Sequence, residues 1–510
     1  MFHFFEHISL PAVFFFVMAL SFLSGIFVLY KRIPLHFIRL HIGFISLAPI
    51  VALLGLITNN GNVMFGPWRF DSRSWLIALF VLTIGLIVQR FSIRYLYGDR
   101  SYRKYFTLMT ITTSADTLTW ISNDLRILLF CWGITLLGLT WLIRLNKEWQ
   151  VSRKAAAMTG RLFLLSWIIL AVTIIWITQS TGHWQLSNVL TKNNLAQLPS
   201  GEKTCMNLLL MVAMIIPSAQ FPFQRWLLNS VVAPTPISAV MHAGIVNAGG
   251  LLLTSFAPLF SGSSAQMILL ILSSISVLLG TGIMLVQVDY KRQLVGSTMA
   301  QMGFMLIQCA LGAYLAAIIH AILHGLFKAS LFLQAGSAIQ YKKSFTFKDR
   351  PLSFSWLMAG GILGLLTGIG YWLISHGGGY QLVSTFILGW SVAFAWTGLV
   401  AFGNGRVSKM AGLISLVGAA IMFHFIHTVL DRLLDKTVIN GSQPHAYAAI
   451  LILLIIGGSS LCIWIARSRS SKLFTFIYLW LVHLGEPHKD LVESHPQYLA
   501  KSLSNRRSFG

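Results

Sequence analysis

Residues 316–333 read AAIIHAILHGLFKASLFL, an apolar run that carries three ionisable side chains. His320, His324 and Lys328 recur in it at intervals of four residues. Because α-helical residues follow each other about every 100°, these side chains fall within about 80° of arc and extend about 12 Å along the axis. The pattern therefore predicts a helix with one ionisable face and otherwise apolar surroundings.

The whole chain has the composition of a protein that crosses a membrane many times. It has 510 residues, of which 56% are hydrophobic and 10% are charged, and its mean hydropathy is +0.73. A soluble globular protein carries roughly 25% charged residues. The composition therefore excludes an ordinary soluble enzyme, a disordered protein and a disulfide-rich secreted domain, and it predicts an all-α multi-pass membrane protein.

Apolar segments of the length that spans a bilayer, about 20 residues, recur along the chain. They predict about 14–15 transmembrane helices, near residues 8–30, 35–57, 74–89, 104–122, 126–143, 162–178, 205–223, 236–257, 266–287, 295–312, 314–340, 353–375, 383–402, 411–430 and 446–466. Segment 104–122 is the most polar and contains Asp116, to which no role is assigned. We expect a transmembrane domain over residues 1–466 and a basic cytoplasmic tail over residues 467–510. The first part of that tail either lies amphipathically in the membrane interface or docks a partner.

The basic residues predict the orientation of the chain in the membrane. The 37 lysines and arginines exceed the 14 acidic residues and give a net charge of +23. With residue 1 outside, roughly 28 basic residues lie on the cytoplasmic side and roughly 7 on the other, as the positive-inside rule requires. The N-terminus is thus expected outside and the C-terminus in the cytoplasm. Because topology accounts for the basic excess, we expect membrane lipid and no nucleic acid as partner.

Ionisable residues within the spans are the first candidates for function. A charge in the bilayer core costs roughly 2.5–3.5 kcal/mol on insertion scales. Histidine changes charge near neutral pH, and a lysine removed from water can approach that range. We interpret His320, His324 and Lys328 as a stepwise proton relay in which Lys328 is a switchable charge. The alternative is that the three side chains only hold helices together by hydrogen bonds.

His242 is a second candidate, within APTPISAVMHAGIVNAGG at residues 233–250. Pro234 and Pro236 interrupt the chain just before this span of small residues. Interrupted backbone at membrane depth is tolerated where it lines a cavity or packs within protein. The segment therefore favours a hydrated cavity at which His242 passes protons, although a structural histidine is the alternative.

A helix break is also expected in IIPSAQFPFQRWL, residues 215–227. Pro217 and Pro222 each remove a backbone donor from the end of an apolar span. A discontinuous helix there would line a cavity or pack against protein. The alternative is a simple kink or an exit from the membrane into a loop.

Charged residues at the start of VDYKRQLVGSTMAQMGF, residues 288–304, form the last candidate group. Asp289, Lys291 and Arg292 are expected at the cytoplasmic end of a span, as a mouth for ions or as a contact with a partner. Interfacial anchoring is the alternative. The histidines are too dispersed for a zinc site and no cysteine pair joins them, so no metal or cofactor is expected in this chain.

Three segments, residues 217–250, 288–304 and 320–337, together resemble the proton-pumping antiporter-like subunits of complex I and their Mrp-type relatives. The similarity runs from about residue 70 to about residue 400. Within that superfamily, FPFQRWL and MHAGIVNAGG look most like DabB, the membrane subunits of energy-coupled inorganic carbon transporters. The resemblance implies two inverted five-helix repeats, each with a broken helix, and places the second break in residues 353–375.

The sequence departs from the complex I pattern at three positions. Those subunits carry a glutamate where this chain has Gly133, and a lysine where it has Pro217. They usually carry another lysine near the end of span 353–375, where the nearest polar residue is His376. The central histidines and lysine of the family do have matches, at His242, His320, His324 and Lys328. The resemblance therefore implies one specialised proton path.

The function that this resemblance implies is transport without enzymatic activity in the chain itself. It implies a proton-conducting, or more generally cation-conducting, subunit in a bacterial inner membrane. The implied partner is a DabA-type zinc protein resembling carbonic anhydrase, in which proton movement drives one-way conversion of CO2 to bicarbonate. Two alternatives are a pumping subunit of an NADH–quinone oxidoreductase and a subunit of an Mrp-type Na+/H+ antiporter. The missing glutamate and lysine argue against the first.

Overall fold

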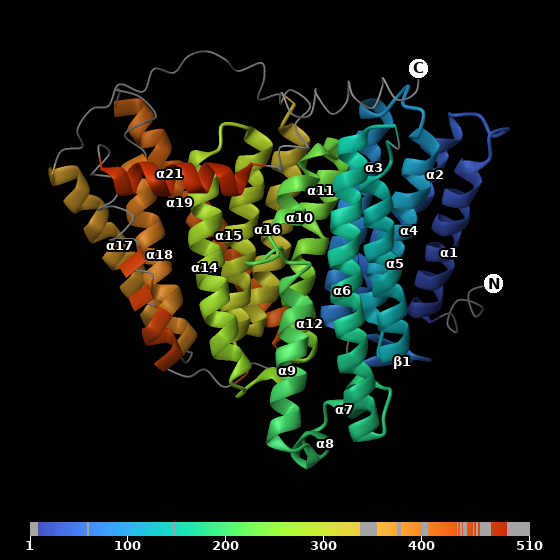
Figure 1. Ribbon diagram of the computed structural model, residues 1–510, viewed down its shortest axis with the longest axis horizontal. Helices are drawn as coiled ribbons and strands as arrows, with labels where there is room; N and C mark the ends of the chain where they lie inside the picture. The colour runs from blue at the N-terminus through green and yellow to red at the C-terminus, as the bar shows by residue number, and fades with distance from the viewer. Residues whose placement is uncertain are drawn as a thin grey trace.

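The helices of the chain stand side by side in a broad layer, and α21 (Lys472–Gly485) lies across them (Figure 1). Helix α1 (Leu10–Leu29) begins at the edge of the layer opposite to α21 (Figure 1). The computed structural model describes residues 9–58, 61–146, 148–336, 354–374, 379–398, 406–435, 437–438, 441, 446–451, 453–454, 457–458 and 471–486.

Six long helices come first: α1 (Leu10–Leu29), α2 (Phe37–Thr58), α3 (Ser72–Tyr95), α4 (Tyr102–Ile121), α5 (Leu125–Ile143) and α6 (Gln150–Thr181). Between α2 and α3 the chain forms an antiparallel hairpin of β1 (Val63–Phe65) and β2 (Trp68–Phe70), in which Val63 pairs with Phe70. The short helices α7 (Leu186–Val189) and α8 (Lys192–Gln197) project beyond the layer on the side of this hairpin (Figure 1).

The next segment is broken into short pieces before long helices resume. The pieces are α9 (Ser200–Ile215), α10 (Arg225–Asn229), η2 (Ser230–Val232), α11 (Thr235–Ala243), η3 (Ile245–Asn247), α12 (Ala248–Ser255) and α13 (Ala257–Phe260). The later long helices are α14 (Ala265–Val286), α15 (Tyr290–Ala310), α16 (Tyr314–Gln334), α17 (Phe354–Ile374), α18 (Gly379–Gly398) and α19 (Arg406–Leu434).

Local sequence sets several helix ends. The Asp71 carboxylate accepts the Ser74 N–H at 2.7 Å and begins α3, and Asp124 begins α5 in the same way. Asp124 also pairs with Arg126 at 2.7 Å. At the C-terminal end of α6, Gly182 has a φ of +72°, a left-handed conformation that glycine adopts without the steric cost of a Cβ atom.

Eight helical segments among the described residues are long and apolar enough to cross a membrane. They are α1, α2, α3, α5, α6, α14, α16 and the stretch Thr235–Ser255 that α11 and α12 form together. The prediction of an all-α multi-pass membrane protein is therefore confirmed. The total of 14–15 spans and the two inverted repeats stay predictions.

The most polar predicted segment, 104–122, forms helix α4 and packs against α1, α3 and α5. Its threonine hydroxyls donate to carbonyls in the preceding turn, as Thr113 Oγ1 does to Met109 O at 2.9 Å. Because neighbouring helices bury this segment, it does not need the apolar surface that a lipid-facing helix needs.

The break expected within residues 353–375 is not present, and that prediction is wrong: α17 runs without interruption from Phe354 to Ile374. Its glycines serve close packing instead. A Cβ atom on Gly364 would lie 2.4 Å from the carbonyl oxygen of Gly389 in α18, and one on Gly360 would lie 2.8 Å from the ring of Trp396. Small residues four apart let two helix backbones approach, and without proline the backbone bonds of α17 stay complete. His376 lies outside the described residues.

Helix α21 is the part of the predicted tail that the structure describes; residues 487–510 lie outside it. Its carbonyl at Val482 accepts a hydrogen bond of 3.3 Å from Gln287 Nε2, just after α14. Its other side leaves Phe476 68% and Leu479 58% exposed. Membrane-surface and partner-docking interpretations of this helix both remain open.

Candidate functional site

Helix α16 carries its row of ionisable residues along the wall of a cavity between helices. The cavity has a volume of about 450 Å³ and lies between α15, α16, α17, α18 and α19. His320, His324 and Lys328 all line it, because their four-residue spacing keeps them on one face. Only 6% of His324 and 1% of Lys328 is exposed, and His320 is half-buried, so two of the three side chains face the protein interior.

Helix α15 runs antiparallel to α16 and presents polar groups to this row. Gln308 Oε1 lies 3.2 Å from His320 Nδ1 near one end, and Lys328 Nζ donates to Leu294 O at 3.0 Å near the other. Gln301 lines the cavity between these two contacts. The two helices therefore form a polar strip that extends through the apolar bundle.

The two imidazoles of the row lie near each other without a direct hydrogen bond. The ring centroids of His320 and His324 are 6.0 Å apart, with the rings inclined at 62°. Among the described residues, the Nε2 atom of His324 has no hydrogen-bond partner. The cavity that His324 lines is large enough to hold water, and water could bridge the two rings.

Three further helices complete the cavity with residues that the sequence patterns did not single out. Tyr371 of α17, Ser384 of α18 and His427 of α19 line it opposite α16. Tyr371 has no ionisable neighbour three or four residues away, whereas His427 follows His424 by three residues and precedes Asp431 by four, a spacing that could have drawn attention to it. The facing glutamines of α15 could have been found, because Gln301 and Gln308 lie seven residues, about two turns, apart on one helical face.

His242 lies beside this cavity but not on its lining. It is fully buried on α11, where its ring stacks on Phe332 of α16 with centroids 4.3 Å apart and an interplanar angle of 14°. Neither ring nitrogen has a hydrogen-bond partner in the part of the chain that the structure describes. Leaving a buried polar group unpaired costs about 1–3 kcal/mol, which makes His242 a candidate for a functional rather than a packing role.

The chain is interrupted on two sides of His242. Helix α9 ends at Ile215, and the irregular segment through residue 224 contains both Pro217 and Pro222. Gln220 Nε2 ties this segment to Ser218 O at 2.7 Å and to Met299 O of α15 at 3.3 Å. The second interruption is at Gly244, between α11 and η3.

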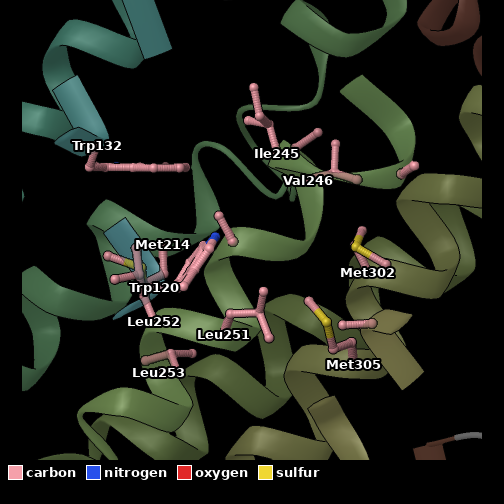
Figure 2. Packing of buried hydrophobic residues seen from close by; sticks show 14 of the residues in the cluster. Trp120, Trp132, Met214, Ile245, Val246, Leu251, Leu252, Leu253, Met302 and Met305 are labelled. Carbon is pink, nitrogen blue, oxygen red and sulfur yellow. The ribbon is translucent and has the colours of Figure 1, made fainter. Parts of the chain in front are cut away.

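Close packing holds the interruptions in place. A Cβ atom on Gly249 would lie 2.1 Å from Ser218 Oγ and 2.7 Å from the carbonyl oxygen of Met214, so α12 approaches the first break only because residue 249 has no side chain. Figure 2 shows the apolar residues around this region, with Trp120 and Trp132 on one side and Met302 and Met305 on the other.

The charged group at the start of α15 lies at the edge of the layer. Asp289 caps the helix by accepting the Arg292 N–H at 3.0 Å. Lys291 Nζ lies 3.5 Å from Ala233 O, in the segment that leads into α11. These contacts support an anchoring role, and a role as an ion mouth stays a prediction.

Gly133 occupies a position where a longer side chain has no space. A Cβ atom there would lie 2.8 Å from Trp167 Nε1, which donates to Leu129 O at 2.9 Å. The indole therefore fills the place toward which a glutamate at position 133 would point.

Comparison with known proteins settles the family. Proteins from Bacillus anthracis and Bacillus subtilis, both named probable inorganic carbon transporter subunit DabB, are 54% and 55% identical to this chain over 497 residues. These alignments cover 97% of this chain and 98% of each relative. This chain belongs to the DabB family.

The membrane domain of this DabB chain is antiporter-like. The family described as NADH:quinone oxidoreductase/Mrp antiporter, TM, matches residues 122–408, and the family described as NADH-Ubiquinone oxidoreductase (complex I), chain 5 N-terminus, matches residues 60–106. A chain in the structure of the Mrp complex from a Dietzia species superposes with a TM-score of 0.63 at 21% identity, over 90% of this chain and 56% of that one. At this identity the superposition establishes the fold alone.

Proposed function

We propose that this chain conducts protons within an inorganic carbon uptake system and thereby powers a DabA-type zinc partner. One observation carries the proposal: His320, His324 and Lys328 stand in a row along one cavity of about 450 Å³. Relatives that match nearly the whole chain are named inorganic carbon transporter subunits.

The row suits stepwise proton transfer. Imidazole both accepts and donates a proton at its two nitrogens. Among the described residues, the Lys328 ammonium group donates one hydrogen bond to the protein, to the carbonyl oxygen of Leu294. No carboxylate is among the residues that line the cavity. The charge of Lys328 is therefore easily switched by a proton or cation that enters the cavity. His242, behind Phe332, passes protons between this cavity and the helix break at Gly244.

The chain supplies the conduction path, and the chemistry of carbon hydration belongs to the partner. Protons that move inward through this subunit drive one-way formation of bicarbonate from CO2 in a zinc site of the partner protein. The subunit lies in the bacterial inner membrane with its N-terminus outside. In support, α21 and the basic start of α15 lie at the same edge of the layer, opposite to α7 and α8 (Figure 1).

Growth of a bacterial host that lacks carbonic anhydrase tests this function. Co-expression of the chain with its zinc partner should restore growth in ordinary air, and bicarbonate should accumulate in the cells. Lys328→Ala and His324→Ala should each abolish the rescue while the protein stays folded and inserted. Ser330→Ala is the matched control, because Ser330 lies on the exposed side of the same helix and bonds only to Leu326 O at 2.9 Å.

The result also separates the alternatives. Full rescue by both variants would refute the relay. Co-purification with quinone-reductase subunits, or with a set of small Mrp-type subunits, would instead assign the chain to energy conservation or sodium exchange.

A further inference from the structure

Asp116 is a buried carboxyl group to which the relay gives no role. It lies on α4, is 6% exposed, and accepts a hydrogen bond of 2.9 Å from the indole Nε1 of Trp120. An ionisable residue within a membrane span is expensive and marks a functional site by default. Trp120 alone does not explain why a carboxyl group is kept there, since an amide would accept the same bond.

Asp116 faces the helix interruption at Gly244. A Cβ atom on Gly244 would lie 4.0 Å from Asp116 Oδ2. Both residues line a small void of about 10 Å³, together with Thr113 and Ile245. A void of about this size is at the lower limit for one water molecule. None of the other residues that line it carries a charge, so the carboxyl group is the one titratable group that borders this void.

His242 provides a second, independent observation at the same interruption. It precedes Gly244 by two residues, is fully buried, and has two ring nitrogens without partners. His242 does not line the void beside Asp116, so a proton from the acid has to cross the interrupted backbone at Gly244 to reach the imidazole. The void has room for one water molecule on the Asp116 side of this interruption.

A row of threonines extends from Asp116 along α4 toward a second, larger cavity. Thr107, Thr110 and Thr113 precede Asp116 at intervals of three residues, which spans about 14 Å of helix. Thr107 lines a cavity of about 780 Å³ at the ends of α1, α4 and α5, and Thr113 lines the void at Gly244. The charged residues of the larger cavity are Asp99, Arg100, Lys104, Arg144 and Glu148. At about 100° per residue these four positions wind around the helix, so Thr107 and Asp116 lie on opposite sides of α4. The threonines therefore mark polar steps around α4 between the charged cavity and the buried acid.

A buried histidine of α2 meets this row at its middle. His41 Nε2 lies 3.1 Å from Thr110 Oγ1, and His41 Nδ1 lies 2.7 Å from Ser24 Oγ. Thr110 Oγ1 also reaches Gln89 Oε1 at 3.3 Å. These side chains form a hydrogen-bonded chain that links three helices to the one that carries Asp116. Hydroxyl and imidazole groups both donate and accept, as proton transfer along such a chain requires.

We propose that Asp116 is a proton-carrying residue that joins the cavity at the end of α4 to His242 through the interruption at Gly244. The carboxyl group takes up a proton from water or hydroxyl on the Thr113 side. It releases that proton to the water in the void, and the proton then crosses the backbone interruption at Gly244 to the imidazole of His242. Each cycle returns Asp116 to its starting state, and no electron is transferred. The inference rests on the proposed function, because it extends the same path.

The test measures proton flux in proteoliposomes that contain the full chain with the chains that co-purify with it. Asp116→Asn keeps the shape and the acceptor for Trp120 but cannot carry a proton, so flux should fall on the order of a hundredfold. Asp116→Glu should retain much of the flux. Thr113→Val and Thr119→Val are a matched pair, because each hydroxyl bonds the carbonyl four residues earlier at 2.9 Å and only Thr113 lines the void. Only Thr113→Val should lower the flux.

Infrared difference spectroscopy gives a second readout that does not depend on flux. A carboxyl band that responds to the bulk pH should be present in the wild type and absent from Asp116→Asn. Wild-type flux in Asp116→Asn, or the absence of such a band, would overturn the proposal. If Lys328→Ala and His324→Ala conduct fully, or the wild type conducts no protons, the proposed function fails. In that case the infrared band alone decides the role of Asp116.

Discussion

Replacing Lys328 with methionine separates a proton carrier from a structural tie between helices. Lys328→Met keeps the length of the side chain and removes its charge and its hydrogen bond of 3.0 Å to Leu294 O. The lost bond is worth about 0.5–1.5 kcal/mol. The carbonyl is not left unpaired, because Thr298 Oγ1 also donates to it at 2.9 Å. Removing a charge from the bilayer core recovers roughly 2.5–3.5 kcal/mol, so the variant should be more stable by about 1–3 kcal/mol.

Function should change in the opposite direction. If Lys328 switches its charge during conduction, Lys328→Met should lower proton flux on the order of a hundredfold. Unfolding in lipid nanodiscs, followed by tryptophan fluorescence, measures the stability, and a pH dye inside proteoliposomes measures the flux. Ser330→Ala on the same helix should change neither. A variant that loses about 2 kcal/mol or more would show that Lys328 holds helices together, because that is the outcome expected for a broken buried polar network.

Three further variants test the packing around the site. Gly249→Ala places a Cβ atom 2.7 Å from a backbone carbonyl and should destabilise the protein by about 1–3 kcal/mol. The control Gly43→Ala meets nothing within 4 Å and should be neutral or stabilising. Thermal unfolding of the two variants measures the difference. Gly133→Glu should fail to accumulate in the membrane, because the Trp167 indole occupies the space that the glutamate side chain needs. Adding Trp167→Ala to this variant should restore accumulation. Equal expression of the single and the double variant would contradict this reasoning. Asp124→Asn removes the ion pair at the start of α5. That pair holds the pKa of Asp124 below its ordinary value, so it stabilises at neutral pH and its contribution disappears as the pH falls through the lowered pKa. The variant should lose about 0.5–1 kcal/mol at neutral pH and nothing in strong acid.

The ionisable row could be predicted from the sequence because helical periodicity is local information. The intervals between His320, His324 and Lys328 place them on one face whatever the rest of the chain does. What faces them is not local. Gln308, Tyr371 and His427 come from three other helices, and only tertiary packing brings them to the same cavity. The same limit explains the position of His242, whose neighbour Phe332 lies ninety residues away in the sequence.

Glycine and threonine patterns were the least informative part of the sequence. The glycines of α17 fit a helix break as well as a packing face, and the small residues of α18, with Gly389 next to Gly364, decide for packing. The threonines of α4 lower its hydropathy until it resembles a loop, yet their hydroxyls bond within the helix and its sides are covered by α1, α3 and α5. A hydropathy scale measures transfer into lipid, and α4 is surrounded by protein.

The interruption at Gly244 and the row on α16 are mechanically one unit. Asn247 Nδ2 donates both to Ala243 O at 2.6 Å and to Ala321 O of α16 at 3.2 Å, and so ties the break to the turn between His320 and His324. A Cβ atom on Gly325 would lie 2.6 Å from Ala243 O, so α16 and the break are in backbone contact. If the charge of Lys328 changes during conduction and shifts α16, we expect the backbone at Gly244 to move with it, because the two are in direct contact. The proposed steps at Lys328 and at Asp116 would then be coupled through this one contact.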